Sequence, residues 1–249
     1  DDIFSGYRRH YALQFDPFLE FLPQGWRKKI ARLARRWGDE RFTWVRRLKK
    51  FLIGIDKNPE ERLVSFFEWS HDDVRKSILN PDFFSKTPCT TPKFSLLESL
   101  REIPDEPSPL NRMLFLDAKH FLTDHNLNYT DKTTMRHAVE TRVPLLDLEL
   151  VEFAAKIPPE FKQKGRIGKA IFKKSMEKFL PREVIYRDKT GFGAPLRKWI
   201  RNDLREVIGD LLSPLALKSR GIFDPEGVKR LIEADREGKV DGAYTIFSV

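Results

Sequence analysis

Two adjacent carboxylates open the chain, in the segment DDIFSGY at residues 1–7. Paired carboxylates are what a hard cation such as Mg²⁺ requires, with water and phosphate oxygens filling its other positions. An acidic first turn of a helix, stabilised by the helix dipole, explains the same two residues without a metal. The residue types alone leave both interpretations open, and the first makes Asp1 a candidate metal ligand.

A lysine that follows a glycine-containing turn is the second candidate for chemistry. Residues 164–174 read KGRIGKAIFKK, and Lys169 stands where an apolar helical pattern begins. A lysine at a helix start can reach an anion, because the helix N-terminus adds its own positive potential. The segment is not a P-loop, because Ala170 replaces the required Ser or Thr and the glycine spacing differs. A surface lysine on an amphipathic helix remains the alternative.

Residues 131–147, DKTTMRHAVETRVPLLD, mix charges of both signs with apolar side chains. The helical pattern at their start must stop before Pro144, because proline disfavours the α conformation in the preceding residue. Asp147 is then a good N-cap for a helix over residues 148–156.

Within that stretch, Glu140 and Arg142 stand among Met135, Val143 and Leu145, and we expect them to be packed there. Charges buried among apolar side chains are costly unless they are paired. We therefore expect both residues to find opposite charges. A structural ion-pair cluster at a helix corner would account for such a stretch without any catalytic role.

The most basic part of the chain lies in residues 26–52, where two amphipathic helical patterns are separated near Gly38. With a formal net charge of +9, the chain suits anionic partners. A solvated basic face is the default interpretation of residues 26–52. A surface that follows nucleic-acid phosphates and a docking face for another domain are the alternatives, and no nucleic-acid motif accompanies the charge.

Most of the remaining chain also has helical patterns. We expect helices over residues 59–69, 70–79, 111–124, 195–212 and 225–236. Residues 80–110 are rich in proline and are predicted to form a loop, linker or lid, with one short helical turn at 94–100.

Length and composition indicate a globular chain of 249 residues with one sizeable core. No apolar run approaches the roughly 18–20 residues that a membrane span needs, and the single cysteine, Cys89, fits a reducing cytoplasm and an ordinary thiol. The chain begins without methionine and stops on an apolar run, so we expect a piece of a longer protein.

Three segments together resemble one family. Residues 1–7 resemble the D-E-x-F-x-G-Y segment of glutamine-dependent asparagine synthetases, with Asp in place of Glu at the second position. Residues 131–147 resemble the hallmark of the family's synthetase domain, and residues 181–196 resemble its L-P-x-x-[IV]-x-x-R-x-K-x-G-F-x-x-P-L segment. The resemblance covers residues 1–9 and 115–212, and the glycine-rich turn that precedes the first segment in the family is absent.

The resemblance implies a fold class that is mainly α, the helical C-terminal portion of an α/β adenine-nucleotide-hydrolase-like (ATP pyrophosphatase) synthetase domain. Residues 1–249 would form the C-terminal part of that domain, with residues 80–110 as its Pro-rich loop. The ATP loop, S-G-G-x-D-S, and an N-terminal glutaminase domain would lie upstream.

The resemblance also implies a function: ATP-dependent amide formation through an acyl-adenylate. The acid substrate would be aspartate or a related carboxylic acid, and glutamine would supply the ammonia. ATP and Mg²⁺ would be the cofactors. The family places such an enzyme in the cytoplasm, without a membrane and without nucleic acid as a partner. The acid that is amidated and the oligomeric state, including a homodimer, are left open. A basic helical nucleic-acid-binding module and a non-catalytic interaction domain are the alternatives.

The site residues follow from the same resemblance, position by position. Asp1 would be a magnesium ligand that faces ATP, whereas the change from Glu to Asp leaves the role of Asp2 in doubt. Lys169 would be the catalytic residue that neutralises the phosphates as the acid attacks ATP. The other expected contacts are with nucleotide, from Gly168 and Gly191, and with the acid, from Asp131 and Lys132.

Overall fold

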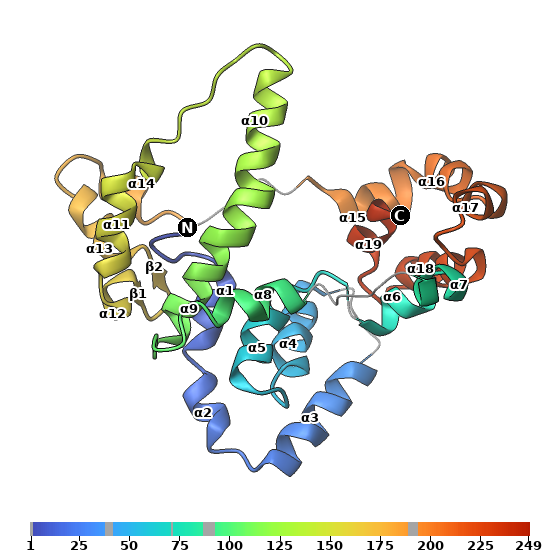
Figure 1. The fold of residues 1–249 in the computed structure, drawn as a ribbon, viewed down its shortest axis with the longest axis horizontal. Coiled ribbons are helices and arrows are strands. Elements are labelled where there is room, and N and C mark those ends of the chain that lie inside the picture. The colour runs from blue at the N-terminus through green and yellow to red at the C-terminus, as the bar shows by residue number, and fades with distance from the viewer. Residues whose placement is uncertain (1, 38–41, 71, 87–92, 189–193) are drawn as a thin grey trace. The chain divides into compact units, whose positions relative to one another are not determined.

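The structure is a computed structural model that describes residues 2–37, 42–70, 72–86, 93–188 and 194–249 (Figure 1). These residues are mainly α-helical, as the resemblance implied. Among them, no helix is both long and apolar enough to cross a membrane. The predictions for Asp1, Cys89 and Gly191 fall outside the described residues.

The chain divides into two compact units, and unit 1 is formed by Asp1–Leu22 and Pro92–Lys189. Its strands, β1 and β2, pair antiparallel as a short hairpin. Its elements are α1 (Arg8–Leu13), α2 (Asp16–Glu20), α8 (Lys93–Leu100), α9 (Pro109–Leu116), the π-helix η1 (Asp117–Leu127), α10 (Asn128–Met135), the 3-10 helix η2 (Pro144–Leu146), α11 (Leu148–Lys156), α12 (Pro159–Lys162), β1 (Gln163–Lys164), β2 (Ile167–Gly168), α13 (Ala170–Met176) and α14 (Arg182–Ile185).

Unit 2 is formed by Pro23–Thr91 and Thr190–Val249. In its core, α6 and α18 lie very close together. A Cβ added at Gly227 of α18 would lie only 1.8 Å from the Ser77 carbonyl oxygen of α6. Its elements are α3 (Gln24–Arg36), α4 (Thr43–Ile53), α5 (Pro59–Ser65), α6 (Asp72–Ile78), α7 (Pro81–Lys86), α15 (Leu196–Lys198), the π-helix η3 (Trp199–Asp203), α16 (Arg205–Leu211), α17 (Pro214–Arg220), α18 (Pro225–Arg236) and α19 (Ala243–Ser248).

Two helix starts marked by a capping aspartate were predicted correctly. The Asp147 carboxylate accepts from the backbone N–H of Glu149 at 3.1 Å and caps α11, which has the predicted bounds. The Asp224 carboxylate likewise accepts from the Gly227 N–H at 2.9 Å and caps α18. Both side chains satisfy donors that the helix itself leaves unpaired.

The prediction of a loop over residues 80–110 was wrong in part. The short helical turn expected at 94–100 is α8, but the described residues also contain α7 and the first residues of α9, with Pro81 and Pro109 at helix starts. Proline is compatible with the first helical turn, where its missing N–H would have no intrahelical acceptor. The single helix predicted over residues 195–212 is also interrupted, because the π-helix η3 separates α15 from α16.

The burial expected around Glu140 and Arg142 was wrong as well. Helix α10 ends at Met135, and the chain that follows is exposed. Glu140 and Arg142 do pair, but with each other, at 2.9 Å. Their own side chains are 69% and 83% exposed, respectively. Their apolar neighbours are exposed too, including Leu145. An ion pair in water contributes only about 0–1 kcal/mol, so this pair does not fix the fold.

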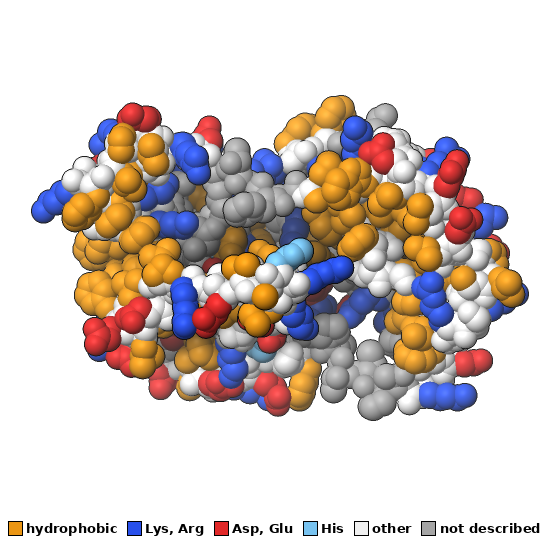
Figure 2. Space-filling view, turned by 90° about the horizontal axis from the view of Figure 1, so that it is seen from above, with side chains coloured by type: hydrophobic (Ala, Val, Ile, Leu, Met, Phe, Trp, Pro, Cys, Tyr) orange, Lys and Arg blue, Asp and Glu red, His pale blue; other side chains and the backbone are white. Residues whose placement is uncertain are grey.

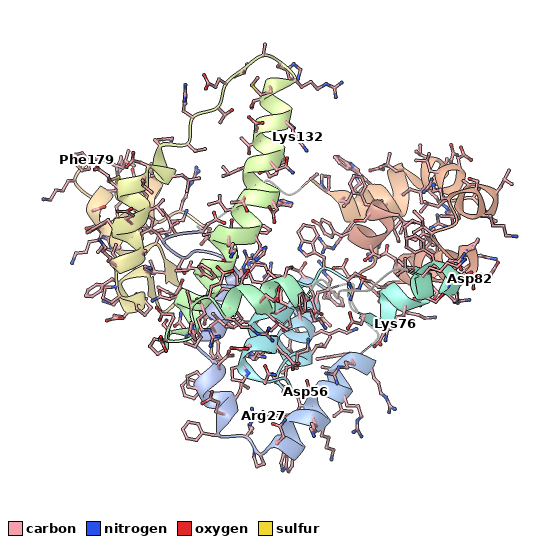
Figure 3. The ribbon with its side chains drawn as sticks, in the orientation of Figure 1. Arg27, Asp56, Lys76, Asp82, Lys132 and Phe179 are labelled. Atoms are coloured by element: carbon pink, nitrogen blue, oxygen red, sulfur yellow. The ribbon has the colours of Figure 1, made fainter. Side chains whose placement is uncertain are left out.

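Exposed apolar side chains continue over the helices that follow in unit 1. Figure 2 shows hydrophobic side chains gathered over the part formed by α11 to α14, at the left of the view. Leu148, Phe153 and Phe179 are each at least 60% exposed, and Phe179 points away from the helices around it (Figure 3). On their inner side, Ala154 of α11 and Phe172 of α13 instead pack with Phe4 of the N-terminal segment.

Candidate functional site

The segment that carries the N-terminal carboxylates is held in place by Phe4. This side chain is 7% exposed and packs with Ala154 of α11 and with Ile157, which directly follows that helix. Its ring also stacks on Phe172 of α13, with ring centroids 5.4 Å apart. Burying an aromatic side chain of this kind contributes about 1.5–3 kcal/mol. The turn that contains Asp2 is therefore fixed against two helices at once.

The β1–β2 hairpin contacts the same turn. The backbone N–H of Lys169 donates to the Phe4 carbonyl oxygen at 3.1 Å. A Cβ added at Gly168 would lie 2.6 Å from the Cα of Gly6, closer than two carbon atoms can pack. Only glycine at position 168 permits this contact, so the sequence requirement at Gly168 is a close approach between two backbones.

Lys169 stands between the hairpin and α13. It is the N-cap residue of α13 and has φ of 56°, in the left-handed region that residues other than glycine seldom adopt. Such backbone conformations are often found at functional sites. Burial lowers the pKa of the Lys169 ammonium group, and the negative charge of Asp2 opposes that shift. The chain thus places a partly desolvated cation near the Asp2 carboxyl group.

Asp2 lies in a small polar group with Tyr7 and Asn126. Its carboxylate accepts from the Tyr7 hydroxyl at 3.1 Å, and the Asn126 amide nitrogen lies 3.5 Å from the same oxygen. Asn126 also donates to the Tyr7 hydroxyl oxygen, at 3.3 Å. Burial raises the pKa of Asp2, against the hydrogen bond from Tyr7, and burial together with the Asp2 charge raises the pKa of Tyr7.

Below this group, His10 and Asp117 form a fully buried pair. The Nε2 atom of His10 lies 2.6 Å from an Asp117 carboxylate oxygen, and neither side chain is exposed. Arg9 donates to the other Asp117 oxygen at 2.5 Å. On the far side of the ring, Nδ1 accepts from the backbone N–H of Gly6 at 3.1 Å. Burial lowers the pKa of His10, although Asp117 opposes the shift. Because Nδ1 accepts from a backbone N–H, the ring proton lies on Nε2, which faces Asp117.

Comparison with known proteins assigns the chain to a family. The model of the family described as asparagine synthase matches residues 1–249. The chain belongs to the asparagine synthase family. It is 27% identical over 253 residues to asparagine synthetase [glutamine-hydrolyzing] 1 of Bacillus subtilis (strain 168), which covers 100% of this chain and 38% of that protein.

Shorter matches point to the same family. Asparagine synthetase [glutamine-hydrolyzing] 3 of Bacillus subtilis is 33% identical over 81 residues, which cover 32% of this chain and 13% of that protein. The nodule asparagine synthetase of Pisum sativum is 37% identical over 70 residues, which cover 25% and 12% respectively. The chain thus spans well under half the length of these relatives. No solved structure matches.

Among the site residues predicted for this asparagine synthase family member, Gly168 and Lys169 lie together against the N-terminal turn. Asp131 and Lys132 are both exposed on α10, beyond η1 (Figure 3). Asp1 and Gly191 fall outside the described residues.

The residue patterns did not single out His10, Asp117 or Asn126. His10 and Asp117 are 107 residues apart in the chain, so local spacing does not reveal the pair. A weak signal was available at Asp117, which interrupts the apolar face of a helix in the segment MLFLDAKHF. A carboxylate in such a position needs a buried partner.

The described residues alone do not form a metal centre of protein ligands. They contain no group of three or more His, Cys, Asp or Glu side chains that could hold an ion. Magnesium bound to a nucleotide uses one or two carboxylates and takes its remaining ligands from phosphate and water. The half-buried Asp2 carboxyl group, next in the chain to Asp1, is compatible with that mode of binding.

Proposed function

We propose that this chain is part of an enzyme that forms an amide from a carboxylic acid, ATP and ammonia derived from glutamine, through an acyl-adenylate. Aspartate is the acid we expect, and a related carboxylic acid is the alternative. The observations that carry the proposal are the asparagine synthase family model, which matches residues 1–249, and the hydrogen bond at 3.1 Å that holds the Lys169 backbone against Phe4 of the N-terminal turn. A lysine ammonium group favours phosphate oxygens.

The chemistry has two steps. An oxygen of the acid's carboxylate attacks the α-phosphorus of ATP, and pyrophosphate leaves. Ammonia then attacks the acyl carbon, AMP leaves, and the nitrogen loses a proton to give the amide. In the first step negative charge accumulates between the acid and the phosphates. A fixed cation in a partly water-excluded place stabilises that charge without reorganisation, and Lys169 is the residue to which we assign this role.

The remaining assignments complete the proposed site. Magnesium, held in part by Asp1, would screen the phosphate charge as the bond to pyrophosphate breaks. Gly168 and Gly191 would lie beside the nucleotide, and Asp131 and Lys132 beside the acid. Ammonia would come from an N-terminal glutaminase domain, and we expect the protein to work in the cytoplasm.

The experiment that tests this function is ATP–pyrophosphate exchange by the whole protein with Mg²⁺, with and without aspartate. Exchange that depends on aspartate supports both the adenylation chemistry and the proposed acid. Exchange with a different carboxylic acid supports the chemistry and changes the substrate. Absence of exchange with every acid offered, in a protein that is folded, contradicts the proposal and favours a non-catalytic interaction domain.

Substitution of the lysine gives the matching test at the residue level. We expect Lys169→Ala to lower the exchange rate by about 100-fold or more, which is the usual scale for removing one group that stabilises transition-state charge. Lys169→Arg keeps the charge and should retain more of the rate. Thermal unfolding of both variants should be close to that of the unmodified protein. Near-normal exchange by Lys169→Ala would contradict the assignment.

A further inference from the structure

The buried pair of His10 and Asp117 is not used by the proposed chemistry, yet it consists of polar groups that are expensive to bury. Both side chains have no exposed surface. Their hydrogen bonds connect α1, the start of η1 and the backbone of the N-terminal turn. A buried polar network of this kind is tolerated only when its members are satisfied, and it then fixes one arrangement of the elements that it joins.

The π-helix η1 explains how one helix reaches this turn twice. Asp117 begins η1 and contacts His10, and Asn126 near its end contacts Asp2 and Tyr7. These helix residues are nine positions apart. In an α-helix, at about 100° per residue, they would point in opposite directions. With the wider i→i+5 winding of a π-helix, roughly 80° per residue, nine positions make two full turns. The π-helix thus aligns both side chains.

The contacts of His10 determine what it can do. Its Nε2–H donates to the buried Asp117 carboxylate, and this bond sets the orientation of the ring. Its Nδ1 then faces the turn and accepts from the N–H of Gly6 at 3.1 Å, with the N–H of Tyr7 at 3.4 Å and the Ser5 hydroxyl oxygen at 3.2 Å. One ring therefore ties two backbone donors of the turn to a carboxylate on another helix.

The turn held in this way is the one that contacts both charged groups of the proposed site. Ser5 in the turn has φ of 69°, and its hydroxyl donates to the Gln163 side chain of β1 at 2.5 Å. Gly6 is in contact with Gly168, and Lys169 is bonded to Phe4. A change in the turn would therefore move the Asp2 carboxyl group and the Lys169 ammonium group together.

We infer that His10 is a positioning residue for the nucleotide site, which acts by accepting hydrogen bonds from the Gly6–Tyr7 backbone while Asp117 fixes its ring. The inference rests on the proposed function, because it supposes that Lys169 faces MgATP, and it adds the Asp2 carboxyl group to that site. It assigns His10 no contact with substrate and no proton transfer. Its role is to keep the turn in the one conformation that presents the two charged groups.

Two substitutions, each matching the shape of one half of the histidine ring, distinguish this role from simple structural support. His10→Asn places an amide oxygen where Nδ1 lies, so it keeps the acceptor for the turn and loses the bond to Asp117. His10→Gln places an amide nitrogen where Nε2 lies, so it keeps the bond to Asp117 and loses the acceptor. The matched control is His120→Gln, also on η1, because His120 bonds Ser99 at 2.9 Å and not the turn.

The measurements are the KM for MgATP and the kcat of pyrophosphate exchange, calorimetric binding of MgATP to the whole protein, and thermal unfolding. We expect His10→Gln to raise KM and the calorimetric Kd by about tenfold, the scale of one buried hydrogen bond. We expect His10→Asn to stay within about threefold of the unmodified protein, and His120→Gln to leave both constants unchanged.

Equal effects of the two His10 variants on unfolding temperature, with KM and Kd unchanged in both, would overturn the inference and leave His10 as structural support. If the His10 variants do not fold, Asp117→Asn provides the test. Its amide oxygen stays with Arg9, so its NH2 group faces Nε2 and the ring proton moves to Nδ1, which can then no longer accept from the turn. We expect KM to rise by about tenfold in this variant. An unchanged KM in that variant would also contradict the inference. Failure of the proposed function looks different, because the unmodified protein would then neither exchange pyrophosphate nor bind MgATP.

Discussion

At Asp2, burial and hydrogen bonding act on the carboxyl group in opposite directions. Burial raises its pKa above the ordinary value of 3.8, and the hydrogen bond from Tyr7 lowers it. The burial effect is the larger, so the ionised carboxylate is less stable here than in water. A carboxyl group kept at a cost to stability is typical of a residue retained for function.

This cost leads to a prediction for Asp2→Asn. The folded protein holds the Asp2 proton to higher pH than the unfolded chain does. Its contribution to stability is therefore present below pH 3.8 and is lost as the pH rises through the raised pKa. We expect the variant to unfold at a higher temperature than the unmodified protein at pH 7. Near pH 3.8 and below, the two should unfold at the same temperature.

The same variant should be less active in pyrophosphate exchange at pH 7, because it lacks the charge beside Lys169. Thermal unfolding at pH 7 and at pH 3.5, together with exchange assays, checks both parts. Asp105→Asn is a suitable control for the change of residue type, because that carboxylate is exposed. A lower unfolding temperature for Asp2→Asn at pH 7 would show that the Asp2 interactions outweigh its burial.

At the residue scale, the predictable part of the site was the part with local sequence patterns. Lys169 and Gly168 lie in one short segment, and the structure places both against the N-terminal turn. His10 has no such pattern, because its partner is contributed by a helix more than a hundred residues away. Pairing between distant segments depends on packing, which residue types and spacing do not encode directly.

At the scale of elements, the β1–β2 hairpin has the narrowest tolerance. Gly168→Ala would place a Cβ 2.6 Å from the Gly6 Cα and 3.0 Å from the Gly6 nitrogen, and both are backbone atoms that cannot rotate away. We expect a loss of about 1–3 kcal/mol in the free energy of unfolding, as for other overpacked sites. We also expect reduced exchange, because the hairpin carries Lys169.

Urea unfolding and exchange assays check the Gly168→Ala prediction. Gly209→Ala on α16 is the matched control, because its added Cβ meets nothing within 4 Å and a helical alanine is favoured over glycine by about 0.5–1 kcal/mol. The control should be as stable as the unmodified protein or slightly more so. If Gly168→Ala behaves like Gly209→Ala, the close approach of the hairpin to the turn is not a constraint on the site.

Elements were predictable where a cap or a proline has a defined meaning, and less so elsewhere. Asp147 and Asp224 marked their helices correctly. Pro81 and Pro109 were interpreted as loop residues although each stands in the first turn of a helix. The π-helix η1 could not be anticipated, because a pattern with a period of 3.6 residues does not distinguish continuous α-helix from a local change of winding.

For the whole molecule, the strong positive charge is the feature that the proposed function explains least. The exposed side of α3 includes Lys28, Lys29 and Arg32. An exposed tryptophan of the same helix, Trp26, has the Lys29 ammonium group 5.9 Å from its ring centroid. Figure 3 marks Arg27 at this helix. Such a face is compatible with a solvated surface and with one that follows nucleic-acid phosphates.

A charge-matched pair of triple variants distinguishes these two interpretations. The first replaces Lys28, Lys29 and Arg32 of α3 by Gln. The second makes the same change in net charge at scattered exposed positions, Lys178, Lys218 and Lys229. If α3 is only a solvated face, both variants should weaken binding to a labelled RNA duplex to the same modest extent, because only net charge matters. Both should keep normal pyrophosphate exchange.

Fluorescence anisotropy over a range of salt concentrations provides the measurement. A nucleic-acid surface on α3 would make the first variant lose far more affinity than the second. It would also lower the slope of log affinity against log salt by about one for each phosphate contact removed. We expect the two slopes to agree, since no other nucleic-acid-binding pattern accompanies the basic residues. Loss of exchange in the first variant alone would instead make α3 part of the enzyme's working surface.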